Sequence, residues 1–165
     1  MARKFVVTGG PGNGKTSVIE KLSKDFIVFP EVAREILKNK EYCLDVQYEI
    51  FVGQVKQNKE SNLVDGNVFF DRGIPDSLAY FRYNQFVILE ELLINSSQKN
   101  TNYEGVFVLD LIPYVKDRIR IESNEEARRI HYILHETYKY LGYQIIKVPF
   151  MSIEERVDFI LDKII

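Results

Sequence analysis

Short apolar runs alternate with longer amphipathic stretches along the whole chain. The runs are rich in Val, Ile and Phe and end at Gly, Pro or Asp, which is typical of strands buried on both faces of a parallel sheet. In the stretches between them, apolar residues recur every three or four positions, which predicts helices. The expected strands are 5–7, 26–29, 68–70, 105–109 and 144–148.

The helical stretches differ in how clearly their ends are marked. Asp45 and Ser152 are residue types that cap helix N-termini. The polar segment 95–104 has no periodicity, so we expect a surface loop there. Because Pro113 prevents the preceding strand from running simply into a helix, we expect 114–123 to be irregular or briefly helical. The expected helices are 15–22, 31–38, 45–60, 74–94 with a break near Asn84, 124–141 and 153–164.

Strands that alternate with helices predict an α/β fold of three layers, in which a five-stranded parallel sheet has helices on both faces. Ligands of such folds bind at the C-terminal ends of the strands. We find no internal repeat and no linker, so the 165 residues are expected to form a single domain. The loops expected at the ligand-binding edge are 8–14, 30–34, 71–75, 110–120 and 148–152.

The amino-acid composition excludes several classes of function. The 22 basic and 24 acidic residues give a net charge of -2, which offers no overall attraction to nucleic acid or to an anionic membrane. Cys43 is the only cysteine, which excludes an internal disulfide and a cysteine-built zinc site. The N-terminus lacks the pattern of a secretion signal, and no apolar run approaches the ~18 residues of a membrane span. We therefore expect a cytoplasmic protein without nucleic-acid or membrane partners.

The first expected strand leads into the strongest motif of the chain, FVVTGGPGNGKT at 5–16. A glycine, four further residues and then Gly-Lys-Thr form the phosphate-binding loop pattern, whose backbone amides surround a polyphosphate at the start of a helix. A chance match in a glycine turn is the alternative, but the apolar strand before and the helix after favour the loop. The residues expected to bind a nucleoside triphosphate, ATP or GTP, are Gly9, Gly10, Pro11, Gly12, Asn13, Gly14, Lys15, Thr16 and Ser17.

Two residues of this loop and one distant carboxylate suggest phosphoryl-transfer chemistry. Lys15 is expected to reach the terminal phosphates, and the Thr16 hydroxyl to hold Mg²⁺. Asp71 ends a buried strand and is the second candidate for Mg²⁺, although it could instead cap the turn at 73–76.

The chain resembles a family of small P-loop ATPases and kinases, often classed as AAA domains, that includes the nicotinamide-riboside kinase domain of bacterial NadR. The resemblance spans nearly the whole chain, and DRGIPDSLAY at 71–80 is its most specific part after the loop. It implies a sheet ordered 2-3-1-4-5 and a mobile lid after the fourth strand. The segments that carry the resemblance are FVVTGGPGNGKTSVIEKL, PEVAREIL, VFFDRGIPDSLAY, YVKDRIRIES, EEARRIHYIL and LGYQIIKVP.

The resemblance also implies roles for residues near the acceptor. Glu31 occupies the position at which similar nucleoside kinases place the carboxylate that receives a sugar hydroxyl proton, although a carboxylate in a first helical turn needs no such role. Arg34 lies one turn further on and is a candidate for contact with the acceptor. Arg72 either clamps an acceptor or phosphate oxygen or pairs structurally with Asp76 or Glu31.

Two further groups complete the predicted site. Arg118 and Arg120 lie in the lid segment, about 111–124, where they are expected to close over the phosphates with Arg120 taking part in catalysis; a solvated run of charges is the alternative. Gln47 and Gln54 are seven residues apart and share one helical face. With the aromatics Tyr48 and Phe51 of the same helix they either read the acceptor or, as is common for helical aromatics, belong to the core. We set aside His131 and His135 as structural or surface residues, because no third metal ligand is evident.

The sequence thus predicts a kinase that transfers the γ-phosphoryl group of Mg-ATP to a hydroxyl of a nucleoside-like small molecule. Its predicted catalytic residues are Lys15, Glu31, Asp71 and Arg120. The alternative is a regulatory nucleotide-binding NTPase that has no small-molecule acceptor. Either protein is expected to be a monomer or a homodimer.

Overall fold

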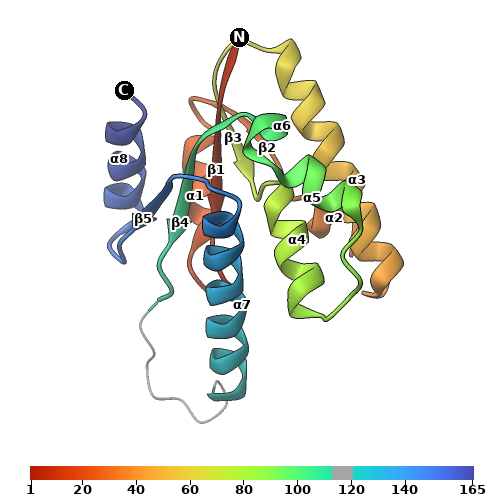
Figure 1. Ribbon diagram of the computed structural model, residues 1–165. Helices are drawn as coiled ribbons and strands as arrows, with labels where there is room; N and C mark the ends of the chain where they lie inside the picture. The colour runs from red at the N-terminus through yellow and green to blue at the C-terminus, as the bar shows by residue number, and fades with distance from the viewer. Residues whose placement is uncertain (113–120) are drawn as a thin grey trace.

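The computed structural model describes residues 1–112 and 121–165, with the backbone alone described at 121–124. Its centre is a five-stranded sheet, all of whose neighbouring strands run parallel (Figure 1). The strand order β2-β3-β1-β4-β5 confirms the predicted fold class and the order that the resemblance implied. The strands are β1 (Ala2–Thr8), β2 (Ile27–Phe29), β3 (Gly66–Asp71), β4 (Tyr103–Leu109) and β5 (Ile145–Val148).

Helices cover both faces of the sheet. The α1 and α8 helices pack together on one side, and α3, α4 and α7 lie on the other (Figure 1). No helix within the described ranges is both long enough and apolar enough for a transmembrane segment. The helices are α1 (Lys15–Leu22), α2 (Val32–Ile36), α3 (Leu44–Glu60), the 3-10 helix η1 (Ser61–Leu63), α4 (Ile74–Tyr83), α5 (Glu90–Ser96), α6 (Gln98–Thr101), α7 (Ile121–Tyr140) and α8 (Ile153–Lys163).

The central strand β1 shows why its apolar run is continuous. Phe5 and Val7 belong to the core layer beneath α1 and α8, whereas Val6 belongs to the layer that contains Tyr138 of α7. Because successive side chains of a strand point to opposite faces, both sets must be apolar when both faces are covered. The side chains of all three residues are buried.

Several predicted boundaries were wrong. The segment 95–104 is not a loop, because it contains α6 and the beginning of β4. The α3 helix begins before Asp45 and has no side-chain cap, and α7 begins at Ile121 rather than at residue 124. Tertiary packing explains why 95–104 is not a loop, because the Thr101 hydroxyl in α6 lies 2.6 Å from the buried hydroxyl of Tyr143.

Candidate active site

The glycine-rich segment forms an open loop between β1 and α1. Gly9, Gly12 and Gly14 have φ angles of 144°, 74° and 76°, a region that side chains with a Cβ rarely adopt. Asn13 Oδ1 accepts a hydrogen bond from the backbone N–H of Lys15 at 3.1 Å, which stabilises the turn into the helix. The motif therefore has the strand-loop-helix context that its sequence predicted, with Thr16 exposed to solvent.

Two residues outside the predicted site form hydrogen bonds with the backbone of this loop. The buried Arg156 of α8 donates a hydrogen bond to the carbonyl oxygen of Asn13. His131 of α7 accepts one from the Gly10 N–H at 3.0 Å through Nδ1. A Cβ at Gly10 would lie 2.7 Å from the Ala127 carbonyl oxygen, so glycine is needed there for α7 to approach. No sequence signal connects Arg156 with the loop.

Charged side chains from three separate elements meet beside the loop. The ammonium group of Lys15 contacts the Asp71 carboxylate directly, and its Nζ lies 3.6 Å from Glu31 Oε2. Arg72 Nε donates to Glu31 Oε1 at 2.9 Å. The structure thus brings together Lys15, Glu31 and Asp71, three of the four predicted catalytic residues. Their roles in catalysis remain predictions.

Burial and charge act differently on the two carboxylates. Burial raises the pKa of Glu31, but the positive charges of Arg72 and Lys15 outweigh it, so this pKa lies below its usual range. Burial also raises the pKa of Asp71, and there the opposing effect of Lys15 is too small to cancel the increase. The Glu31 carboxyl group is therefore ionised at neutral pH.

Arg72 occupies a strained position at the end of β3. Its φ of 72° lies in the left-handed region, which a residue with a Cβ avoids unless its surroundings hold it. The side chain is held by Glu31 and, through NH1, by the Gly9 carbonyl oxygen at 3.1 Å and Asp76 Oδ1 at 3.2 Å. Both structural partners that the sequence suggested are present. The role of Arg72 as a clamp on substrate remains a prediction.

Asp76 links three elements of the site. Its carboxylate accepts hydrogen bonds from the hydroxyls of Thr8 in β1 and Tyr138 in α7, and from the Gly73 N–H at 2.9 Å. Arg72 supplies a further donor. Asp76 is buried, and a carboxyl group in such a place requires hydrogen-bond partners of this kind. From the sequence, Asp76 was expected only as a partner of Arg72.

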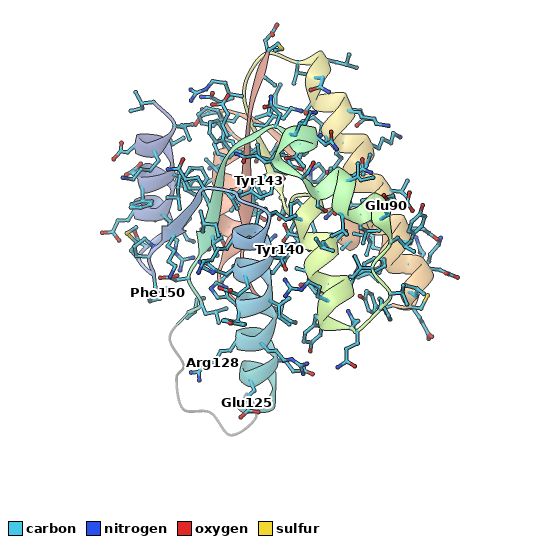
Figure 2. All side chains as sticks on the ribbon, in the orientation of Figure 1. Glu90, Glu125, Arg128, Tyr140, Tyr143 and Phe150 are labelled. Carbon is cyan, nitrogen blue, oxygen red and sulfur yellow. The ribbon has the colours of Figure 1, made fainter. Side chains whose placement is uncertain are left out.

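Replacing Tyr138 by phenylalanine is expected to lower the free energy of unfolding by about 1.5–3 kcal/mol, because it removes a buried hydrogen bond to a charged group. Urea unfolding followed by circular dichroism would measure the change. Tyr140 is the matched control, because it lies on the same helix (Figure 2). It is 79% exposed, so Tyr140→Phe should change stability by less than about 0.5 kcal/mol. Equal effects of the two variants would show that Tyr138 does not stabilise the Asp76 cluster.

Arg34 lies on the phosphate side of the site. Its NH2 group is 3.1 Å from Thr16 Oγ1 and 3.4 Å from Glu31 Oε2, and the side chain is largely exposed. It is not among the residues that line the cavity described below. Its contact with an acceptor remains a prediction.

The predicted Mg²⁺ ligands are oxygen donors beside the loop. Thr16 has an exposed hydroxyl and Asp71 a carboxylate, which are donor types that Mg²⁺ accepts when phosphates and water complete its shell. Within residues 1–112 and 121–165, no group of three or more His, Cys, Asp or Glu side chains is placed to hold a metal alone. The donors therefore fit a Mg²⁺ ion that arrives with a nucleotide.

A cavity of about 390 Å³ opens next to Glu31 and Arg72. The predicted pair Gln47 and Gln54 lines it. Phe51 belongs to the core between α3, α4 and α5 and Tyr48 packs against that core, which is the second of the two alternatives for these aromatics. Tyrosines from other segments line the cavity instead. The lining residues are Glu31, Ala33, Leu37, Tyr42, Gln47, Ile50, Gln54, Arg72, Asp76, Ser77, Tyr80, Tyr83, Asn84, Glu126 and Ile130.

Most of the predicted lid falls outside the described residues. Arg118 and Arg120 lie within 113–120, so their predicted roles are not tested. The last part of the predicted lid, 121–124, belongs to the first turns of α7. Arg128 is exposed near this end of α7 (Figure 2).

Comparisons with known proteins agree with this architecture. Thymidylate kinase from Ehrlichia chaffeensis is 14% identical, with a TM-score of 0.70 and 99% of each chain covered. Deoxyadenosine kinase from M. mycoides is 16% identical, with a TM-score of 0.63 and 98% of each chain covered. NadR in complex with NAD and AMP-PNP is 18% identical with a TM-score of 0.71, and the match covers 99% of this chain and 48% of NadR.

These structural likenesses establish the fold. A search among curated proteins found no match. A family model described as an AAA domain, however, matches residues 4–156. Because that match spans most of the chain, from within β1 through the phosphate-binding loop to the start of α8, the chain belongs to this AAA domain family of P-loop proteins.

Proposed function

We propose that the protein is a small-molecule kinase, which transfers the γ-phosphoryl group of Mg-ATP to a hydroxyl of a nucleoside-like acceptor. The position of Glu31 is the observation that carries this proposal. Its carboxylate lies 3.6 Å from Lys15 Nζ of the phosphate-binding loop, and the same residue lines the cavity. A carboxylate between a phosphate site and an acceptor-sized cavity is what phosphoryl transfer to a hydroxyl requires.

The similar structures support the same chemistry. Two are a deoxyadenosine kinase and a thymidylate kinase, and NadR has been crystallised with NR and with AMP-PNP. All share the fold of this chain at low identity, so they support a nucleotide donor and a nucleoside-like acceptor without specifying either. GTP would engage the same loop amides as ATP, since these amides contact phosphate rather than base.

The ion pairs of the site suggest how the donor binds. Without a ligand, Lys15 is neutralised by Asp71 and Glu31. With a triphosphate bound, Lys15 would pair with a phosphate oxygen instead of Asp71, and Asp71 and Thr16 would be the residues that hold Mg²⁺. Both charges keep a partner, so the exchange avoids leaving a buried charge unpaired. Bound Mg²⁺ would neutralise charge on the β- and γ-phosphate oxygens.

Glu31 then orients the acceptor. Its lowered pKa keeps it ionised, so it can accept a hydrogen bond from the acceptor hydroxyl. It can receive the hydroxyl proton as the new P–O bond forms and the bond from the γ-phosphorus to the bridging oxygen breaks, which releases ADP. Phosphoryl transfer through a loose transition state needs mainly positioning and electrostatic stabilisation, so a weakly basic carboxylate is sufficient. Arg72 holds Glu31 in place through its bond to Oε1 and adds positive charge beside the cavity.

An acceptor panel tests the proposal. The protein would be incubated with Mg²⁺ and ATP or GTP, together with ribonucleosides, deoxynucleosides, nicotinamide riboside or thymidylate, and phosphorylated products would be measured by mass spectrometry. We expect product from at least one acceptor, at a rate above that of hydrolysis without acceptor. Tight nucleotide binding with slow hydrolysis and no phosphorylated acceptor would instead support a regulatory NTPase.

A further inference from the structure

A directional chain of hydrogen bonds runs along one wall of the cavity. We call it the amide relay, and it consists of Asn84, Tyr42, Gln47, Ser77 and Gln54, all of which line the cavity. Gln47, Gln54 and Ser77 are buried, and they come from the neighbouring helices α3 and α4. Each side chain of the relay donates to the next, so the orientation of the last one depends on the first.

The start of the relay is anchored by the backbone. Asn84 Nδ2 donates to the Tyr80 carbonyl oxygen at 2.8 Å, and a carbonyl can only accept. The Asn84 amide therefore cannot be reversed without bringing two acceptors together. Its second hydrogen is directed to the Tyr42 hydroxyl oxygen at 2.8 Å. The Tyr42 hydroxyl must then use its own hydrogen elsewhere.

The hydrogen of the Tyr42 hydroxyl determines the direction of the remaining hydrogen bonds in the relay. Tyr42 donates to Gln47 Oε1 at 2.9 Å, and Gln47 Nε2 donates to Ser77 Oγ at 3.3 Å. Ser77 in turn donates to Gln54 Oε1 at 2.6 Å. Burial, with smaller effects of Tyr80 and Cys43, raises the pKa of Tyr42 to about 12, so Tyr42 keeps its proton at neutral pH. The relay thus fixes Oε1 of Gln54 towards Ser77.

The consequence is a fixed donor in the cavity. Since Oε1 of Gln54 is held by Ser77, Nε2 is the group left for a ligand. Among the described residues, no group accepts a hydrogen bond from Gln54 Nε2. This nitrogen is not one of the fully buried side-chain atoms that lack a partner, and Gln54 lines the cavity. An amide NH₂ group in a lined cavity favours a carbonyl oxygen opposite it.

We infer that the amide relay makes the cavity selective for acceptors whose ring presents a keto oxygen to Gln54, in preference to the matching ring with an amino group. This inference rests on the proposed function, because it concerns the acceptor of that same reaction. An amino group at this point would place two donors opposite each other and leave both without an acceptor. The expected preference for the keto ring is at least about tenfold in affinity.

Calorimetric titration without nucleotide tests the inference directly. Uridine would be compared with cytidine, and inosine with adenosine, because the members of each pair differ in a ring keto or amino group. The wild-type protein should bind the keto member of at least one pair at least about tenfold more tightly. Ser77→Ala releases Gln54 Oε1, so the amide can reverse and the preference should fall to within about threefold.

Two further variants distinguish loss of the relay from loss of the folded structure. Tyr42→Phe breaks the relay two bonds away from Gln54, at a partly exposed side chain, and should also reduce the preference. Ser96→Ala is the matched control, since Ser96 is buried in α5 and its hydroxyl has no partner within the described residues. Ser96→Ala should keep the wild-type preference.

The outcomes separate this inference from the kinase proposal. A keto preference that disappears in both relay variants supports the inference, whether or not the ligand is phosphorylated. Equal binding within both pairs, tighter binding of the amino members, no detectable binding of any of the four, or an unchanged preference in Ser77→Ala would overturn it. Phosphorylated product formed in parallel from any acceptor would leave the kinase proposal intact in each of those cases.

Discussion

Lys15→Ala is expected to lower kcat/KM for phosphoryl transfer by at least about 10²–10³-fold, the usual cost of removing one donor that stabilises transition-state charge. Lys15 begins the helix after the phosphate-binding loop, and the structure contains its ammonium group in a buried cluster with Asp71 and Glu31. Without it, no side chain of the loop itself brings positive charge to the terminal phosphates. Initial rates with the preferred acceptor would measure the effect.

The same substitution should also destabilise the protein without nucleotide. Asp71 and Glu31 would lose a shared buried partner, and breaking such a pair costs about 3–5 kcal/mol. Lys21→Ala is the matched control, because Lys21 lies on the same helix but forms an exposed ion pair with Glu154. Lys21→Ala should leave activity unchanged. Activity in Lys15→Ala close to wild type would remove the phosphate-binding role from this residue.

Glu31→Gln is expected to lower kcat by about 10²–10⁴-fold, the range of a general-base contribution, with little change in nucleotide affinity. The substitution keeps the size of the side chain and an oxygen that can accept the bond from Arg72 Nε. It removes the negative charge that would receive the acceptor proton. Single-turnover kinetics and nucleotide titration would separate the two quantities.

Glu35→Gln provides the comparison for Glu31. Glu35 lies in α2, the short helix that begins directly after Glu31, but its exposed carboxylate pairs only with Lys38 among the described residues, so this variant should retain wild-type kcat. Nearly equal kcat for Glu31→Gln and wild type would show that Glu31 has no catalytic role. A large rise in nucleotide Kd with unchanged kcat would assign Glu31 to the donor site instead.

The lowered pKa of Glu31 predicts a distinct pH dependence of stability. Its pKa in the folded protein lies below the ordinary value of 4.5, so its ion pairs stabilise the fold above pH 4.5 and are lost as pH falls through the folded value. The unfolding temperature of the wild type should therefore fall on acidification below pH 4.5 more steeply than that of Glu31→Gln. Identical acid dependence in the two proteins would contradict the assigned pKa shift.

Much of the candidate site was visible in the sequence because its signals are local. The loop motif combines glycines, a lysine and a threonine at fixed spacing within a strand-loop-helix unit, and the structure has that unit between β1 and α1. The apolar runs likewise predicted five strands, since burial on both faces requires continuous apolar residues. The strand order had to come from family resemblance, because run length and periodicity carry no information on which strands are neighbours.

Other features were decided only by tertiary packing. Asp76 collects donors from β1 and α7, and Arg156 reaches Asn13 from 143 positions away in the chain. Tyr48 and Phe51 looked suited to a binding face but fill the core between helices. A hydrogen bond between distant segments leaves no periodic trace in the sequence, and an aromatic side chain on a helix is equally compatible with a core and with a pocket.

The amino-acid sequence by itself therefore determined the phosphate-binding loop, the alternation of strands and helices and the carboxylates at the strand ends, because each depends on the properties of neighbouring residues. The tertiary structure alone decided which of these carboxylates share Lys15, which helices support the loop and which polar side chains line the cavity. These features depend on how the chain crosses the sheet, which places residues such as Lys15 and Asp71 in contact although 56 positions separate them.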